Sequence, residues 1–135
     1  MSKERPEKEA PEIDIIAAVK DHNTAVVSDA VRQGLDLDVV DKNGMTPLML
    51  AVNDGRLDLV KIILKANVAI NAQDRWGQTA LMLAAGRKDV LSAKLLIESG
   101  ANVQLVARSG LSALGYALDN GAKEIARILK QAGAH

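Results

Sequence analysis

The sequence predicts an all-α solenoid in which short helix-turn-helix units stack on one another and are joined by β-turn hairpin loops. The first observation is an internal repeat: residues 41–51, 74–84 and 107–117 align at an offset of 33 residues. The second is that two further ladders keep the same period. These ladders are Gly34, Asn67, Gly100 and Gly133, and Ala18, Ala51, Ala84 and Ala117.

The composition suits such an array and excludes several function classes. Of the 135 residues 48% are hydrophobic, yet there is no Phe and only one Trp and one Tyr, so the core must be aliphatic. The 17 basic and 17 acidic residues give zero net charge, which argues against non-specific nucleic-acid binding. The absence of Cys excludes disulfides, thiol catalysis and Cys-based zinc sites.

The N-terminal residues 1–11 predict a flexible lead. They carry mixed charges and two prolines and have no apolar segment, so they do not resemble a secretory signal. The longest apolar runs fall far short of the roughly 18 residues of a membrane span. We therefore expect a soluble, cytoplasmic protein that does not bind membranes.

Each unit begins with a turn and a helix start. Asp41 and Asp74 each begin an Asp-x-x-Gly sequence that favours a turn, whereas Ala107 lacks the carboxylate, so we expect the third tip to be the least rigid. Thr46-Pro47 is a typical helix N-terminus, and Thr79 and Ser112 keep the capping hydroxyl in the later repeats. The next expected features are a break near Gly55, a second helix, and a left-handed residue from the Gly/Asn ladder.

The chain divides into one domain, residues 12–135, made of four units. We assign 12–40 to an N-terminal cap repeat, 41–73 and 74–106 to full repeats, and 107–135 to a C-terminal cap repeat. Asp29 and Lys130 place charges where the inner repeats have aliphatic residues. Because terminal repeats need a polar outer face, we expect a complete small array.

This turn-helix-helix unit of 33 residues, with Thr-Pro-Leu at its start, resembles the ankyrin repeat over about residues 12–135. The resemblance implies a non-catalytic module that binds a protein partner through the turn tips and the concave face of the first helices. The usual His after Thr-Pro-Leu is replaced by Met49, Met82 and Gly115. We therefore expect looser hairpins, because the hydrogen bonds of that His are missing.

No catalytic, metal or cofactor-binding residues are predicted. The only histidines, His22 and His135, are expected at opposite ends of the stack, and no phosphate-binding glycine motif is present. Carried over residue by residue, the resemblance instead implies a partner-binding surface. It consists of Lys42, Asn43, Met45, Arg75, Trp76, Gln78, Arg108, Ser109 and Leu111 at the tips, and Asn53, Asp54, Arg87, Asp119 and Asn120 at the ends of the first helices.

Two patterns on this surface indicate the kind of partner. Lys42, Arg75 and Arg108 occupy the same repeat position and predict a cationic row, although exposed tips are often charged without a specific reason. Trp76 aligns with Asn43 and Ser109, so the scaffold does not require an aromatic residue there, and Trp is a frequent interface anchor. We therefore expect an acidic partner segment with apolar anchors.

Tyr116 replaces the leucines of the earlier repeats, and we expect its ring to pack while its hydroxyl reaches solvent. The protein is expected to be a monomer, with weak self-association through the apolar tips as one alternative. Inhibition of a specific partner enzyme is another. Nucleic-acid binding through the cationic row is disfavoured by the zero net charge and the scarcity of stacking aromatics.

Overall fold

The computed structural model describes residues 13–135, and the lead expected over residues 1–11 lies outside the described residues. Residues 13–135 form eight helices in four consecutive pairs. The helices are α2 (Ile15–Lys20), α3 (Thr24–Arg32), α4 (Pro47–Asn53), α5 (Leu57–Leu64), α6 (Ala80–Gly86), α7 (Val90–Glu98), α8 (Ala113–Asp119) and α9 (Lys123–Gln131).

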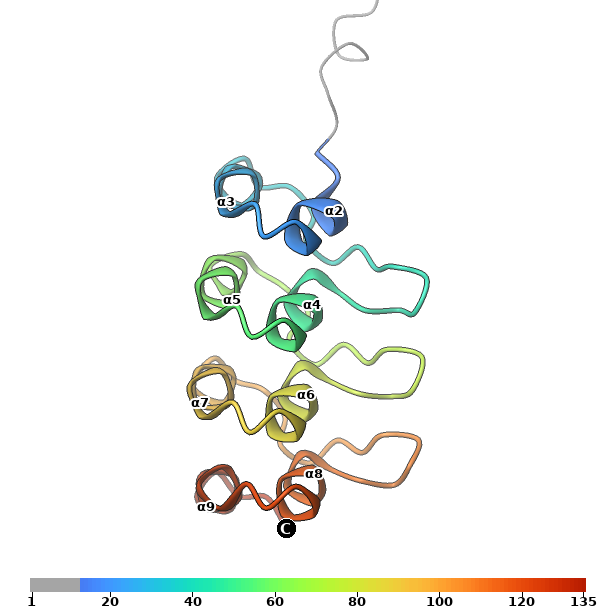
Figure 1. Cartoon of the computed structure of the whole chain (residues 1–135), viewed down its shortest axis with the longest axis vertical. Coiled ribbons are helices and arrows are strands. Elements are labelled where there is room, and N and C mark those ends of the chain that lie inside the picture. The colour runs from blue at the N-terminus through green and yellow to red at the C-terminus, as the bar shows by residue number, and fades with distance from the viewer. Residues whose placement is uncertain (1–12) are drawn as a thin grey trace, which may run out of the picture.

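The four helix pairs stack in chain order (Figure 1). The first helices α2, α4, α6 and α8 form one column, and the second helices α3, α5, α7 and α9 form another. Three hairpins project from the side of the first helices, and each lies between two successive pairs (Figure 1). Within residues 13–135 the extended pairing is limited to one isolated antiparallel bridge, between Val106 and Ser112. The predicted all-α repeat architecture is confirmed.

The first helices of repeats two to four begin where the sequence predicts. Thr46, Thr79 and Ser112 are N-caps in extended conformation, and each hydroxyl accepts a hydrogen bond at 3.2 Å from the backbone N–H three residues later. Pro47 occupies the first turn of α4, where its missing N–H is harmless. Local chemistry thus sets the point at which the chain leaves each hairpin.

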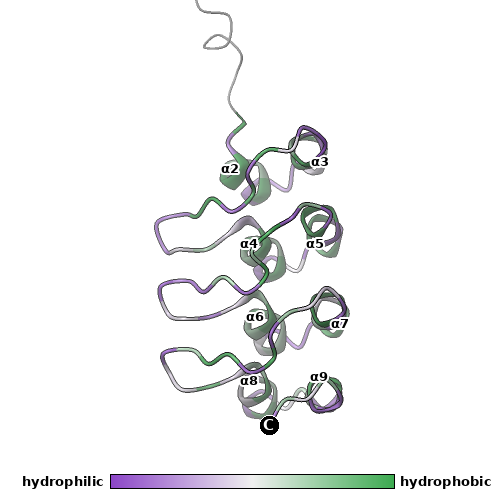
Figure 2. Ribbon diagram, turned by 180° about the vertical axis from the view of Figure 1, so that it is seen from behind, coloured by the Kyte–Doolittle hydropathy of each residue, from purple (hydrophilic) through white to green (hydrophobic). Residues whose placement is uncertain are grey.

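The core is aliphatic and runs through the whole stack. In Figure 2 green predominates on the first helices, whereas purple marks the hairpin tips and parts of α3 and α9. The alanine ladder is buried, with Ala51, Ala84 and Ala117 fully inaccessible, so the first helices can approach one another closely. Larger side chains on the second helices, such as Leu59 and Leu96, are also fully inaccessible. Helices of six to nine residues are marginal alone, and this burial stabilises them.

One predicted helix ending is wrong. At Gly34 the backbone is left-handed (φ +73°), and the next N–H, of Leu35, bonds back to the carbonyl of Ala30 at 3.0 Å. Asn67 does not adopt a positive φ, and the following N–H, of Val68, bonds to Ala66 instead. The reason is that α5 ends at Leu64, one residue earlier than its counterparts, so the left-handed closure is not reached.

The left-handed residues between the paired helices form a second ladder. The break predicted near Gly55 is confirmed, because this glycine has φ +69° between α4 and α5. The equivalent positions hold Gly121 (φ +69°) and two non-glycine residues, His22 (φ +56°) and Lys88 (φ +59°). A β-carbon disfavours this conformation, so His22 and Lys88 are strained.

Both charged positions expected at the ends of the stack are accessible. Asp29 is partly buried and forms an ion pair with Arg32, and Lys130 is exposed on α9. No helix in residues 13–135 is long and apolar enough to cross a membrane.

Candidate functional site: the hairpin row

Two hairpins are closed by a buried or partly buried carboxylate, as predicted. The Oδ1 atom of Asp41 accepts hydrogen bonds from the backbone N–H groups two and four residues later, at 2.8 and 3.0 Å. Asp74 repeats both bonds at 2.9 Å. These aspartates therefore point into their own turns, and their charges are directed away from the exposed tips.

The last hairpin is closed differently, because Ala107 has no carboxylate. The N–H of Ala107 still donates to the carbonyl of Leu111 at 2.9 Å, and the hydroxyl of Ser109 accepts the N–H of Leu111 at 3.3 Å. This tip retains the hairpin shape with fewer side-chain bonds.

Successive hairpins are tied edge to edge. The N–H of Arg75 donates to the carbonyl of Asn43, and the N–H of Arg108 donates to the carbonyl of Trp76, both at 3.0 Å. Gly77 has φ +77°, and a β-carbon there would lie 2.9 Å from the backbone nitrogen of Arg108. Glycine at this position therefore allows the close approach, and the three hairpins form one continuous row.

Trp76 is the most exposed of the predicted apolar tip groups. Its side chain is 47% accessible, whereas Met45 and Leu111 are only partly accessible, and Met45 packs against the core. The guanidinium of Arg75 lies 5.2 Å from the centre of the Trp76 ring, within the range of a cation–π contact. Arg75 also donates to the side chain of Asn43 at 3.4 Å, which holds it between the two tips.

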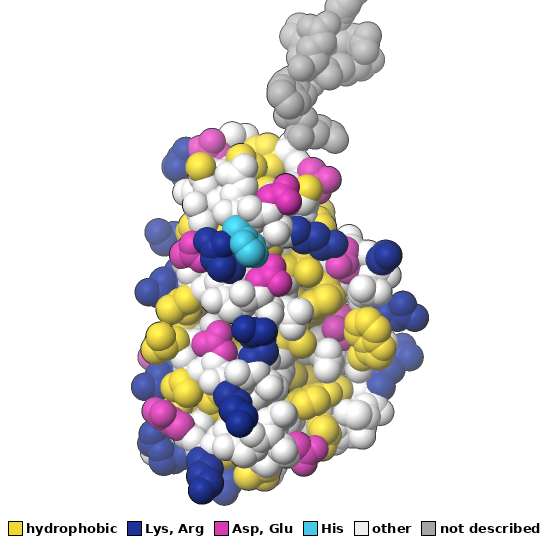
Figure 3. All heavy atoms as spheres, in the orientation of Figure 1, with side chains coloured by type: hydrophobic (Ala, Val, Ile, Leu, Met, Phe, Trp, Pro, Cys, Tyr) yellow, Lys and Arg dark blue, Asp and Glu magenta, His cyan; other side chains and the backbone are white. Residues whose placement is uncertain are grey.

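The predicted cationic row is present at the surface. Lys42, Arg75 and Arg108 are exposed, and no ion pair among residues 13–135 involves them. In Figure 3 dark-blue Lys and Arg side chains and one large yellow group gather along the right-hand edge, on the side to which the hairpins project. This edge therefore combines positive charge with apolar surface.

The other predicted site residues lie at the far ends of the first helices. The first helices of repeats two to four have seven residues, which is about 10 Å of helix between these positions and the hairpins. All five are exposed, although the side chain of Asn120 donates to the carbonyl of Tyr116 at 2.8 Å. They are Asn53, Asp54, Arg87, Asp119 and Asn120.

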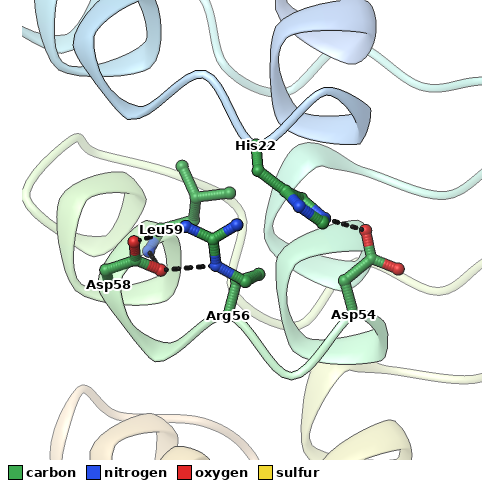
Figure 4. Close-up of polar contacts among 5 residues, drawn as sticks. All are labelled: His22, Asp54, Arg56, Asp58 and Leu59. Carbon is green, nitrogen blue, oxygen red and sulfur yellow. Dashed lines mark hydrogen bonds and ion pairs between the residues drawn. The ribbon is translucent and has the colours of Figure 1, made fainter.

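Asp54 is engaged by a neighbouring repeat. Its Oδ2 atom lies 3.2 Å from Nε2 of His22 in the turn between α2 and α3 (Figure 4). The sequence placed His22 in this turn but gave no sign of the contact, which joins residues 32 positions apart. Asp54 precedes by one residue the position that is equivalent to His22 in the next repeat. This near-match is the signal in the sequence that could have indicated the contact.

A second polar pair lies beside this contact, at the start of α5 (Figure 4). Arg56 donates two hydrogen bonds to Asp58, at 3.1 and 2.7 Å. These bonds lower the pKa of Asp58 below its ordinary value, and the N–H of Leu59 lowers it further. The same pair raises the pKa of Arg56.

Tyr116 lies beside the predicted site residues, which the sequence interpretation did not anticipate. Its ring is partly buried on α8, as expected, but its hydroxyl meets Gln78 at 3.3 Å and Ser109 at 3.4 Å. Together with Trp76 and Arg108 these residues line an open hollow of about 470 Å³. The signal was the break in the leucine ladder, but the partner 38 residues away could not be deduced from it.

No constellation for metal chemistry is present in the part of the chain that the structure describes. Within residues 13–135 no three His, Asp or Glu side chains lie close enough together to hold a metal ion. His22 and His135 lie in the first and last repeats. The hairpin row instead combines positive charge, hydrogen-bond donors and an exposed indole on one surface.

Comparison with known proteins identifies the repeat. A comparison with curated protein sequences gave no significant match. The family model described as ankyrin repeats, three copies, matches residues 15–107 and again residues 66–135. These matches cover the four helix pairs and the three hairpins, so the chain belongs to the ankyrin repeat family.

Proposed function

We propose that this protein binds a partner protein through the hairpin row and the exposed ends of the first helices. Ankyrin repeats generally mediate protein–protein interaction and are typically non-catalytic. The observation that carries the proposal is Trp76, which is 47% exposed in the middle of a hydrogen-bonded row of hairpins. Because backbone hydrogen bonds join the hairpins and hold the tips in place, we expect little conformational entropy to be lost when a partner binds.

The partner is an acidic segment with apolar anchors. Lys42, Arg75 and Arg108 supply one sign of charge along the row, while Asp41 and Asp74 face their own turns. Such a row steers an acidic segment and raises its association rate. Trp76 supplies apolar area, and a buried Trp at an interface contributes about 2 kcal/mol or more.

Affinity capture from the native lysate tests this assignment. We expect the double variant Trp76→Ala/Arg75→Glu to lose a partner that the unaltered chain retains. The matched control is Leu91→Ala/Lys94→Glu on α7, which removes another exposed apolar group and reverses another exposed charge away from the hairpins. If the first variant captures every partner as well as the control does, the face is wrongly assigned.

Self-association is the second candidate, and one observation favours it. Leu118 is 58% exposed at the open face of the last repeat, whereas its equivalents Val52 and Ala85 are fully buried by the repeat that follows them. Light scattering across a concentration series distinguishes the two functions. A strict monomer at high concentration removes self-association, and an oligomer that Leu118→Arg dissociates supports it.

A further inference from the structure

The hollow between the last two hairpins and α8 differs from the rest of the row. It is an open depression with a volume of about 470 Å³, and it is lined by Trp76, Gln78, Arg108, Ser109 and Tyr116. The residue equivalent to Tyr116 in the preceding repeat is Leu83. The residue equivalent to Gln78 in the repeat before its own is Met45. The polar lining is therefore specific to this place in the stack.

The hydrogen-bonding groups in the hollow leave donors unused. Gln78 donates one amide N–H to the Tyr116 oxygen at 3.3 Å, and the Tyr116 and Ser109 hydroxyls share a single contact at 3.4 Å. Ser109 also accepts the N–H of Leu111. The hydroxyls of Tyr116 and Ser109 have one proton each, and only one of these protons is used in the contact between them. The other proton remains available for an incoming acceptor.

Arg108 adds the charge that selects among incoming acceptors. Its guanidinium is a pure donor with five N–H groups, and no ion pair in residues 13–135 involves it. Arg75 differs, because it contacts the Trp76 ring and Asn43 and does not line the hollow. Arg108 is therefore the cation among the residues that line the hollow, and Arg75 lies against the indole outside it.

We propose that this hollow receives the carboxylate of an Asp or Glu side chain from the partner segment. The carboxylate accepts from Arg108 and from the spare hydroxyl proton, and a large apolar residue next to it in the segment lies on the exposed indole of Trp76. Charge-assisted bonds of this kind are among the strongest in proteins. This inference rests on the proposed function and assigns one anchor of that same face.

Selection from a displayed random-peptide library on the unaltered chain supplies the probe. We expect the selected peptides to share one Asp or Glu beside a large apolar residue. Binding of a synthetic selected peptide is then measured by isothermal titration calorimetry, which also works in Trp76 variants that lack the only Trp in the chain. Replacing the acidic residue of the peptide by Gln is expected to weaken binding about tenfold or more.

Variants of the chain show which side chains cause the preference for an acidic residue in the peptide. Arg108→Gln is expected to bring the Glu-to-Gln affinity ratio close to one, and Tyr116→Phe is expected to reduce it while keeping the ring. Lys94→Gln, which neutralises an exposed charge on α7, is expected to leave the ratio unchanged. Arg108→Glu is expected to bind a peptide in which Lys replaces the acidic residue, which a purely structural role of Arg108 would not produce.

The possible failures are distinguishable. Selected peptides without acidic enrichment, a ratio that survives Arg108→Gln, or a selection that yields no binding peptide each overturn the hollow as a carboxylate site. If peptide binding depends on Trp76 and Arg75 but not on Arg108 or Tyr116, the hollow is wrong and the proposed face stands. Peptide binding that is insensitive to Trp76 and Arg75 as well overturns the face itself.

Discussion

Lys88 holds a backbone conformation that glycine adopts more easily. Its φ of +59° matches the +69° of Gly55 and Gly121, which occupy the same place in neighbouring repeats. A residue with a β-carbon is disfavoured there by roughly 1–2 kcal/mol. The side chain is exposed, so its replacement removes strain without removing a buried contact.

We therefore expect Lys88→Gly to raise the free energy of unfolding by about 0.5–1 kcal/mol, after the greater flexibility of glycine in the unfolded chain is subtracted. Urea denaturation measures the change. Gly121→Ala is the reverse control, because no atom lies within 4 Å of the added β-carbon and strain alone is introduced. A loss of stability in Lys88→Gly would contradict the inference that the backbone is strained at Lys88.

Asp58 gives the stability of the fold a defined pH dependence. Hydrogen bonds from Arg56 hold its folded-state pKa below the ordinary 3.8, so the carboxylate stabilises the fold above that value. This stabilisation is lost as the pH falls through the folded-state pKa. We expect Asp58→Asn to be less stable than the unaltered chain near neutral pH and equal to it at the acidic end.

Chemical denaturation across an acidic pH series tests this prediction. Arg56→Gln removes the same pair from the other side, so it should reproduce most of the loss, and the double variant should lose little more. A difference between Asp58→Asn and the unaltered chain that persists at low pH would show that another property of Asp58 is responsible.

Residues whose role is local were predictable, and those whose role depends on a neighbouring repeat were not. The capping bond of Thr46 and the turn-closing bonds of Asp41 span at most four residues, so their motifs were sufficient to predict them. The left-handed conformation predicted for Asn67 was wrong, because its conformation depends on where α5 ends. Tyr116 was not predicted to lie beside the candidate site, because the residues that its hydroxyl contacts belong to two hairpins, one of them in the preceding repeat.

At the scale of helices and hairpins, the first hairpin forms an ion pair with the preceding helix that the second hairpin does not repeat. Lys20, in the last turn of α2, lies 3.8 Å from Oδ2 of Asp41 in the following hairpin. One repeat later Asn53 stands in place of Lys20, and Oδ2 of Asp74 is buried without a hydrogen-bond partner among the described residues. The second hairpin in the row therefore lacks the ion pair of the first.

We expect Asn53→Lys to restore this pair and to stabilise the fold by about 0.5–1 kcal/mol, the upper range for an ion pair at the surface. Thermal or urea unfolding measures the gain. Because a cation at the end of α4 also suits the helix dipole, the same substitution is made in an Asp74→Asn background. An equal gain in that background would assign the effect to the helix and not to the pair.

The arrangement of helices was predictable because one unit, once identified, fixes all the others. The period of 33 residues sets the register, and the buried alanine ladder sets the approach of the first helices. The position of the hollow was not predictable, since it depends on hairpin-to-hairpin contacts such as the bond from Arg108 to Trp76. Spacing reveals which residues share a row, but not the distances between their side chains.

At the scale of the whole molecule, stability is unevenly distributed because contacts join adjacent repeats. Helix α6 packs against α4 and α8, whereas among residues 13–135 the helix neighbours of α9 lie in its own repeat and the one before. In such arrays stability is approximately a sum of repeat and interface terms, so the end repeats open first. The hollow lies across the last of these interfaces.

Two core substitutions separate local opening from global unfolding. Leu81 in α6 and Ile125 in α9 are both almost fully buried, and truncation of either to alanine removes about 2–5 kcal/mol. We expect Ile125→Ala to accelerate amide hydrogen exchange mainly in α8 and α9. Leu81→Ala is expected to accelerate exchange throughout, because it weakens both interfaces of an internal repeat.

Hydrogen exchange followed by mass spectrometry also connects this gradient to binding. If the hollow anchors the partner, a bound acidic peptide must slow exchange in α8 and in the last hairpin more than in α2 and α3. It follows that Ile125→Ala should weaken peptide binding although Ile125 does not line the hollow, since the open end repeat no longer presents Arg108 and Tyr116 together. Equal acceleration along the whole chain in Ile125→Ala would show instead that the four repeats unfold as one unit.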